Sequence, residues 1–153
     1  MSFIDRAVIH VTAGTGGSGA ESFRREKFVP KGGPDGGDGG RGGSVFLQAD
    51  PHLTTLLDYQ YKSHWRAKRG DHGSGANKTG RSAEDVHLPV PLGTEVRDAV
   101  TGELLGELLS PGDVLRVAKG GRGGRGNAQF ATSTHRAPRE WEPGEKGDRK
   151  SVV

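Results

Sequence analysis

The glycines of this chain fall in blocks, and within each block they recur at every third residue. The longest row comprises Gly33, Gly36, Gly39 and Gly42, with a second row at Gly37, Gly40 and Gly43 beside it. Shorter rows with the same spacing are Gly14 and Gly17, Gly16 and Gly19, Gly70 and Gly73, Gly120, Gly123 and Gly126, Gly121 and Gly124, and Gly144 and Gly147. A period of three matches the left-handed polyproline II helix, which has three residues per turn. One glycine row leaves one face of such a helix bare, and two rows leave two faces bare, so neighbouring helices can approach closely.

The sequence leaves three other interpretations of these blocks open. A collagen triple helix requires glycine at every third position without interruption, whereas these blocks stop after a few turns. Flexible glycine linkers usually carry serine and show no period. The block from Gly120 to Gly126 (GGRGGRG) also matches the Arg-Gly-Gly repeats of disordered RNA-binding tails, and this third alternative is the serious competitor.

Short strand-like segments separate the glycine blocks. The alternating or β-branched segments are residues 7–11, 44–49, 86–90, 95–98, 103–106 and 114–117. Pro89 predicts an edge strand because proline cannot donate to a ladder, and Val100-Thr101-Gly102 predicts a hairpin turn. The helical candidate is residues 53–59. The predicted fold is mainly β, a small β-barrel or sandwich with an inserted bundle of glycine-rich left-handed polyproline-II-type helices.

Composition narrows the functional classes. There are 27 glycines among 153 residues and no cysteine, so neither a disulfide framework nor a thiolate metal site is possible. No signal peptide is evident, and no apolar run approaches the ~20 residues of a membrane helix, so we expect a cytoplasmic protein. Charge is segregated: residues 84–113 hold seven acids and one arginine, whereas residues 119–139 hold five basic residues and no acid. Such segregation favours a polyanionic partner, the alternative being solvated loops whose charges average out in space.

The sequence contains no convincing nucleotide-binding, metal-binding or catalytic motif. The segment from Gly73 to Thr79 resembles a phosphate-binding P-loop, but the two required glycine positions are Asn77 and His72. Gly14, Gly16 and Gly19 form a G-x-G-x-x-G match that no apolar helix follows. The six histidines form no helical metal-binding pair. Asp35 and Asp38 are expected to bind arginine or backbone N–H groups of a neighbouring helix, in one row with Arg41 and Ser44. We predict no catalytic residue, no metal site and no cofactor in this chain.

The basic loop segments are the better functional signal. Residues 24–31 (RREKFVPK) precede the longest glycine block, Lys78 and Arg81 lie in a polar loop, and Arg136 and Arg139 come shortly before Trp141. Basic side chains with aromatic rings nearby suit phosphate contacts and base stacking. Arg24 and Arg25 are the exceptions, which we expect to pair with acids in a structural role.

Several motifs together resemble the N-terminal glycine-rich domain of the Obg GTPase family. They are residues 22–40 (SFRREKFVPKGGPDGGDGG), 14–19, 55–59, 120–127, Ala137-Pro138 and 144–147, in order along almost the whole chain. The resemblance implies a β-barrel with six glycine-rich left-handed helices and, for the family, cytoplasmic GTPases that bind the large ribosomal subunit in its late assembly and in stress control. It implies that loop tips contact ribosomal RNA, at positions matching Lys27, Lys31, Lys78, Arg81, Arg136 and Arg139.

The chain also departs from the family pattern. Family members continue into a GTPase domain, which would hold GTP and Mg²⁺. We expect a single domain over residues 1–153, with an ordered core over 1–149 and a tail over 150–153 leading to a GTPase domain absent from this sequence. Residues 82–85 (SAED) lack a glycine and an extra basic residue expected in that loop. We expect a monomer that binds large ribosomal subunits and their RNA, with no membrane span and no small-molecule substrate. The alternatives are a structural or protein-interaction module and a disordered Arg-Gly-Gly segment.

Overall fold

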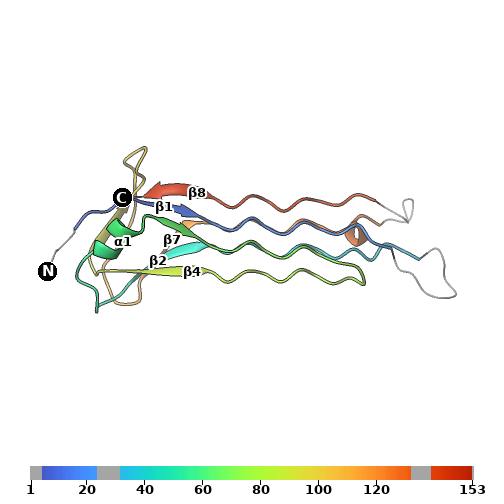
Figure 1. The fold of residues 1–153 in the computed structure, drawn as a ribbon, viewed down its shortest axis with the longest axis horizontal. Coiled ribbons are helices and arrows are strands. Elements are labelled where there is room, and N and C mark those ends of the chain that lie inside the picture. Colours follow the sequence, from blue (N-terminus) through green and yellow to red (C-terminus); the bar gives the residue numbers. More distant parts are fainter. Residues whose placement is uncertain (1–4, 24–31, 132–138, 153) are drawn as a thin grey trace.

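The computed structural model describes residues 5–23, 32–131 and 139–152. Figure 1 shows an elongated molecule with strands gathered at one end and a bundle of long irregular segments extending from them. The elements in chain order are β1 (Ile9–Thr12), β2 (Val45–Ala49), α1 (Leu57–Tyr61), β3 (His64–Arg66), β4 (Val86–Val90), β5 (Thr94–Arg97), β6 (Leu104–Leu108), β7 (Val114–Ala118), the 3-10 turn η1 (Asn127–Phe130) and β8 (Arg149–Val152). The predicted mainly-β class is confirmed.

Six glycine-rich segments form the bundle in the described part of the chain. They are segment I (residues 13–22), segment II (34–43), segment III (67–74), segment IV (78–85), segment V (119–126) and segment VI (141–148). Backbone hydrogen bonds between them repeat every third residue. In the ladder between segments I and II, N–H groups donate to carbonyl oxygens over 2.8–2.9 Å, from Gly14 to Gly43, from Gly17 to Gly40 and from Ala20 to Gly37. The period read from the glycines is therefore the period of the hydrogen bonds, while the polyproline II conformation stays a prediction.

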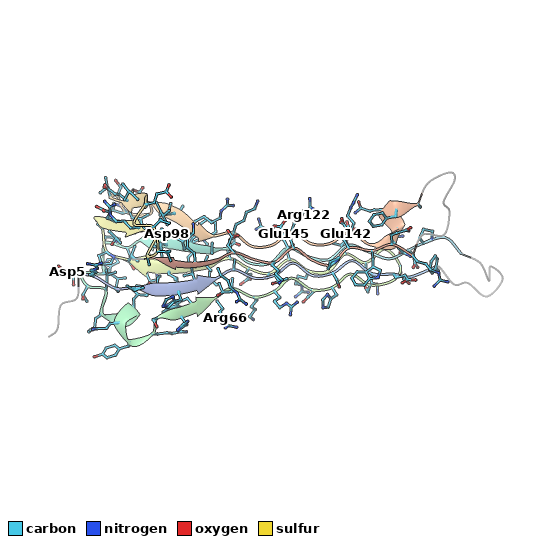
Figure 2. All side chains as sticks on the ribbon, turned by 90° about the horizontal axis from the view of Figure 1, so that it is seen from above. Asp5, Arg66, Asp98, Arg122, Glu142 and Glu145 are labelled. Atoms are coloured by element: carbon cyan, nitrogen blue, oxygen red, sulfur yellow. The ribbon has the colours of Figure 1, made fainter. Side chains whose placement is uncertain are left out.

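The glycine rows lie on the faces where the segments contact their neighbours. Segments I and II, each with two glycines in three, exchange backbone hydrogen bonds with four other segments. Segment VI has one row, Gly144 and Gly147, and bonds to segments I and V. At Gly39 an added Cβ would lie 1.8 Å from the Gly17 carbonyl oxygen, so no side chain fits. Charged side chains therefore project from the outside of the bundle (Figure 2). This bonded bundle includes residues 120–126, in contrast to the disordered Arg-Gly-Gly alternative.

The strands build three small sheets, ordered β3-β1-β8, β4-β2-β7 and β5-β6. The predicted edge strand is confirmed, since β4 pairs only with β2 among the described strands, and β5 and β6 form the predicted antiparallel hairpin. The turn between them contains Gly102 at φ 76°, a left-handed conformation that glycine adopts without strain. The helix is shorter and later than expected, at Leu57–Tyr61.

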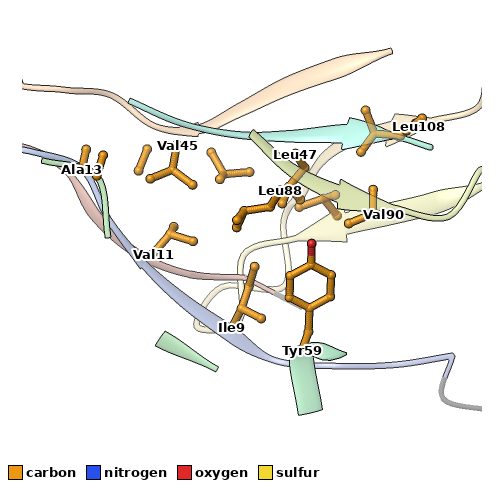
Figure 3. Close-up of a cluster of buried hydrophobic side chains, with 14 residues drawn as sticks. Ile9, Val11, Ala13, Val45, Leu47, Tyr59, Leu88, Val90 and Leu108 are labelled. Carbon is orange, nitrogen blue, oxygen red and sulfur yellow. The ribbon is translucent and has the colours of Figure 1, made fainter. Parts of the chain in front are cut away.

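The hydrophobic core lies where the three sheets meet. Alternate residues point inward, so that Ile9 and Val11 of β1, Val45 and Leu47 of β2, and Leu88 and Val90 of β4 are buried together with Val96, Leu108 and Tyr59 (Figure 3). The Tyr59 hydroxyl donates to the Pro89 carbonyl oxygen, which satisfies the polar end of a buried ring. Burying a side chain such as Leu108 contributes about 1.5–3 kcal/mol to stability.

Two strands were not predicted. Strand β3 pairs in parallel with β1, and β8 pairs with the other edge of β1 in antiparallel register. Residues 150–152, expected in a tail, therefore lie in the sheet. Neither β3 (HWR) nor β8 (RKSV) has a clear apolar alternation. Their extended conformation is fixed by pairing with β1.

Candidate nucleic-acid interface

The end of the bundle opposite the sheets carries Lys78 and Arg139, and Arg81 lies one repeat farther toward the sheets. Segments III and IV meet there in a turn over residues 74–78, and η1 lies nearby as the orange helical turn in Figure 1. Three predicted contact residues are exposed, Lys78 and Arg81 on segment IV and Arg139 just before segment VI. We call this end the tip.

Asp35 holds the turn that precedes Lys78. Ala76 and Asn77 adopt φ values of 59° and 55°, a left-handed conformation that costs energy for a residue with a Cβ. The Asp35 side chain compensates, because one carboxylate oxygen accepts the Ala76 N–H at 3.0 Å and the Asp35 carbonyl accepts the Asn77 N–H at 2.7 Å. Strand-like pairing of Ser74 with Lys78 closes the turn. The turn is therefore fixed by segment II rather than left as a free loop.

Lys78 and Arg81 lie three residues apart on segment IV, one repeat of the bundle. Both side chains are exposed, and neither has an ion pair with another described residue. Their backbone carbonyls accept from Ser74 and Asp71 at 3.0 and 2.9 Å, so the main chain is anchored while the cationic ends are open to solvent. The sequence predicted these two residues, and the structure brings them to one row.

Arg139 is partly engaged within the chain. Its guanidinium lies 3.3 Å from a carboxylate oxygen of Glu21 and 5.7 Å from the Phe23 ring centroid, and its side chain is 81% exposed. An exposed ion pair of this kind contributes only about 0–1 kcal/mol, so a phosphate can displace Glu21 at little cost. Trp141, 47% exposed, follows two residues later and offers a ring face for stacking.

Arg125 differs from these cations because its side chain is bound within the protein. It holds Glu142 with two side-chain hydrogen bonds, at 2.8 and 3.1 Å, and lies over the Phe130 ring. These bonds lower the pKa of Glu142 to about 2. Arg125 therefore ties segment V to segment VI and is not open for a ligand.

The remaining predicted contacts, Lys27, Lys31 and Arg136, lie outside the described residues, as do Arg24 and Arg25. Residues 82–85, where a basic residue was missing from the expected pattern, have structural contacts. Asp85 accepts the Ser44 N–H at 2.9 Å and lies 3.6 Å from Arg41, and Ser82 accepts the Arg41 N–H.

The comparisons with known proteins decide the family. The GTP1/OBG family model matches residues 4–153. The chain belongs to the GTP1/OBG family. It is 60% identical over 148 residues to a GTPase Obg of Chlorobium chlorochromatii, covering 97% of this chain and 44% of the relative. It is 58% identical to GTPase Obg proteins of Chloroherpeton thalassium and of Moorella thermoacetica, covering 98% and 99% of this chain and 45% and 36% of those relatives.

This GTP1/OBG chain spans less than half the length of those relatives. Its two glycine-rich phosphate-binding candidates have their N–H groups engaged within the bundle. Gly73 and Ser74 donate to Ser18 and Lys78, and Ala76 donates to Asp35. Gly14, Gly16, Gly17 and Gly19 likewise all donate to carbonyls of segments II and VI. A phosphate cradle needs such donors free, so these segments serve the family's glycine bundle instead.

Asp38 tests one expectation from the sequence, and two observations on the described residues stand beside it. Asp38 accepts the Gly126 N–H at 2.9 Å, which confirms the expectation that these aspartates bind backbone groups of a neighbouring segment. Among the described residues, no group of three or more histidines and acids is placed to hold a metal ion. None of the described helices is long and apolar enough to cross a membrane.

Sequence reasoning missed Asn127, the fully buried residue at the tip end of segment V. Segments II and V pair through Gly42 to Gly121 and Gly39 to Gly124, and the next donor, Gly36, bonds to the Asn127 side-chain oxygen at 2.8 Å. The Asn127 side-chain amide donates to the Ser22 carbonyl at 2.9 Å. A side chain thus replaces the carbonyl where η1 turns the backbone away. The signal was present, since Asn127 occupies the next position of the Gly121–Gly124 row.

Proposed function

We propose that this chain is the ribosome-binding domain of an Obg-family GTPase, and that its tip contacts ribosomal RNA of the large subunit. The proposed role of the longer protein is in late assembly of that subunit and in the stress response, within the cytoplasm. The observation that carries the proposal is the pair of exposed cations, Lys78 and Arg81, held one bundle repeat apart without an ion pair among the described residues.

The construction of the bundle supports this role. Because each segment is bonded to its neighbours at every third residue, the cations sit on an anchored main chain. A pre-organised contact loses less conformational entropy on binding than a flexible loop does. Arg139 and the exposed Trp141 add a displaceable cation and a stacking surface at the same end. This combination suits phosphate contacts and unstacked bases of folded RNA.

GTP hydrolysis belongs, in this proposal, to another part of a longer protein. The relatives are named GTPase Obg, and this chain spans less than half of each. GTP and Mg²⁺ would be held there, and this chain would act as a monomeric anchor without a cofactor of its own. GTP binding by the isolated chain with micromolar affinity would contradict that assignment.

The test is co-sedimentation of the 153-residue chain with purified large subunits at low and high salt. We expect association at low salt and a steep loss with added salt, because phosphate contacts release counterions. Lys78→Glu with Arg81→Glu should weaken association strongly. Lys62→Glu with Arg116→Glu makes the same charge change at exposed positions near the sheets and should have a small effect.

A second arm reverses Lys27, Lys31 and Arg136, the contacts predicted from the sequence, and should also weaken association. The competing function is a rigid spacer or protein-docking module, which predicts a folded chain that does not associate with subunits or RNA. Failure of the wild-type chain to associate at low salt would favour that function and contradict ours for the isolated domain.

A further inference from the structure

A basic groove runs along the bundle near the sheets, away from the tip. Its floor is β1 and the start of segment I, with the hydroxyl-bearing residues Thr12 and Thr15. One wall carries Arg66 and Arg69, and the other carries Lys146 and Arg149. The groove has a volume of about 760 Å³. That is within the ~300–1,000 Å³ typical of ligand sites, and is more than one phosphate group requires.

Strand register explains why these cations share a face. Thr12 pairs with Arg66 across one edge of β1 and with Arg149 across the other. Residues paired directly in a sheet project to the same side, and the inward positions are taken by the buried Val11 and the half-buried Trp65. Arg66, Thr12 and Arg149 therefore form one outward row across three strands.

The threefold repeat of the bundle extends this row. Arg69 follows Arg66 by three residues, Thr15 follows Thr12, and Lys146 precedes Arg149 by three in the antiparallel direction. At about 3.1 Å per residue in a polyproline II chain, successive cations lie roughly 9 Å apart along the groove. Two pairs of cations thus flank a line of two hydroxyl groups.

The same repeat keeps Glu142 and Glu145 of segment VI out of the groove lining. Glu142, Glu145 and Asp148 form a different row of segment VI, and their N–H groups donate to carbonyls of segment V. Glu142 bonds to Arg125, and Asp148 accepts the Lys119 N–H at 3.0 Å. Figure 2 shows Arg66 on the opposite side of the molecule from Arg122 and Glu145. Asp148, whose side chain is engaged with segment V, is the one acid among the described residues that line the groove.

The groove cations are open to a ligand. None of Arg66, Arg69, Lys146 and Arg149 has an ion pair or side-chain hydrogen bond with another described residue, and neither do the hydroxyls of Thr12 and Thr15. Farther along the same row, the ring nitrogen of His72 accepts the Ser18 N–H at 2.9 Å, which ends the open floor. Four uncompensated cations around hydroxyl donors form an environment suited to anions.

We propose that this groove binds the phosphodiester backbone of an RNA strand. The inference deepens the proposed function, on which its biological setting rests, by adding a second contact remote from the tip. The ~9 Å spacing of the cation pairs suits a chain of phosphates rather than a single phosphate ion. The described residues that line the groove offer exposed charge and hydroxyls but no aromatic ring, so the groove contacts the backbone and does not read bases.

The test is fluorescence anisotropy of a labelled single-stranded RNA with the full 153-residue chain. Arg69→Gln with Lys146→Gln removes two groove cations, and Arg116→Gln with Arg122→Gln removes two cations elsewhere. Each phosphate contact on a single strand contributes about 0.7 to the slope of log Kd against log salt concentration. The loss of two contacts therefore lowers this slope by about 1.4. The Kd ratio of groove variant to wild type should then fall about sevenfold between 50 and 200 mM salt, and exceed sevenfold at 50 mM. The control variant should remain within about twofold of the wild type.

Further variants and competitor molecules in the same assay distinguish the possible explanations of a loss of binding. Arg69→Lys with Lys146→Arg keeps both charges and should restore binding, which excludes a folding defect as the cause. A Kd for the groove variant equal to that of the control would overturn the groove, whatever the tip does. Loss of binding in the groove variant with full binding by Lys78→Gln with Arg81→Gln would keep the groove and contradict the tip. Polyglutamate that displaces the RNA as well as tripolyphosphate does at matched charge would overturn a site for a chain of phosphates.

Discussion

Gly39→Ala tests whether backbone contact between bundle segments determines stability. The added Cβ would lie 1.8 Å from the Gly17 carbonyl oxygen and 2.2 Å from its carbon, where ordinary contacts begin at 3.4 Å. These are backbone atoms, so segments I and II must separate. Separation strains or breaks the bond from Gly17 to Gly40, and the shift of segment II also strains its bond to segment V, from Gly39 to Gly124. Each buried group left unpaired costs about 1–3 kcal/mol, and overpacking adds about 1–3 kcal/mol.

The expected loss is therefore about 3–6 kcal/mol, a large part of the ~5–15 kcal/mol that stabilises a typical domain. Urea unfolding followed by circular dichroism measures it, and Tm should fall by roughly 10 °C or more. Gly33→Ala is the matched control, because Gly33 belongs to the same row but an added Cβ would meet nothing within 4 Å. It should be neutral or stabilise by up to ~1 kcal/mol. A Gly39→Ala protein whose stability lies within about 1 kcal/mol of that of Gly33→Ala would refute the reasoning.

Two further predictions concern polar contacts of the bundle. Asn127→Ala leaves the Gly36 N–H and the Ser22 carbonyl without their partner, so we expect a loss of about 2–5 kcal/mol in the same unfolding assay, and an unchanged midpoint would contradict this role. The pKa of Glu142 in the folded chain is about 2, below its ordinary 4.5, because Arg125 bonds to the carboxylate through its side chain and its backbone N–H. This contribution to stability is present above pH 4.5 and is lost as pH falls toward 2. Glu142→Gln should therefore flatten part of the acid limb of a stability–pH curve, and an identical limb would show that the pair contributes nothing.

The glycine pattern made much of the bundle predictable, since rows of bare backbone permit only close contact between segments. The positions of Asp35 and Asp38 within the longest glycine block also indicated their bonds to backbone N–H groups. Strand β8 was not predictable, because residues 149–151 are polar and the strand is extended through pairing with β1. The groove could not be predicted for a related reason. Arg69 and Lys146 are far apart in the sequence, and they line the same groove only because of how the neighbouring strands pair with β1. The cation spacing of three, shared by 66–69 and 146–149, was the available signal.

For the residues of the tip, too, the sequence predicted some roles and the structure was needed for others. Lys78 and Arg81 were found from their charge in a polar loop, and the structure adds that they share a row and lack ion pairs with described residues. Arg125 would have looked equally suitable from its Arg-Gly-Gly context, yet its bonds to Glu142 commit it to holding segments together. Only three-dimensional pairing separates a cation open to a ligand from a cation that is part of the scaffold.

The central claim is that the tip, and not the β5–β6 turn, faces ribosomal RNA. The chain contains no cysteine, so single cysteines can carry a photocrosslinker at chosen positions. Thr79→Cys places it beside Lys78 at the tip, and Val100→Cys places it at an 87% exposed position of the β5–β6 turn. On large subunits at low salt, we predict RNA cross-links from position 79 and none from position 100. RNA cross-links from position 100 with none from position 79 would contradict the account.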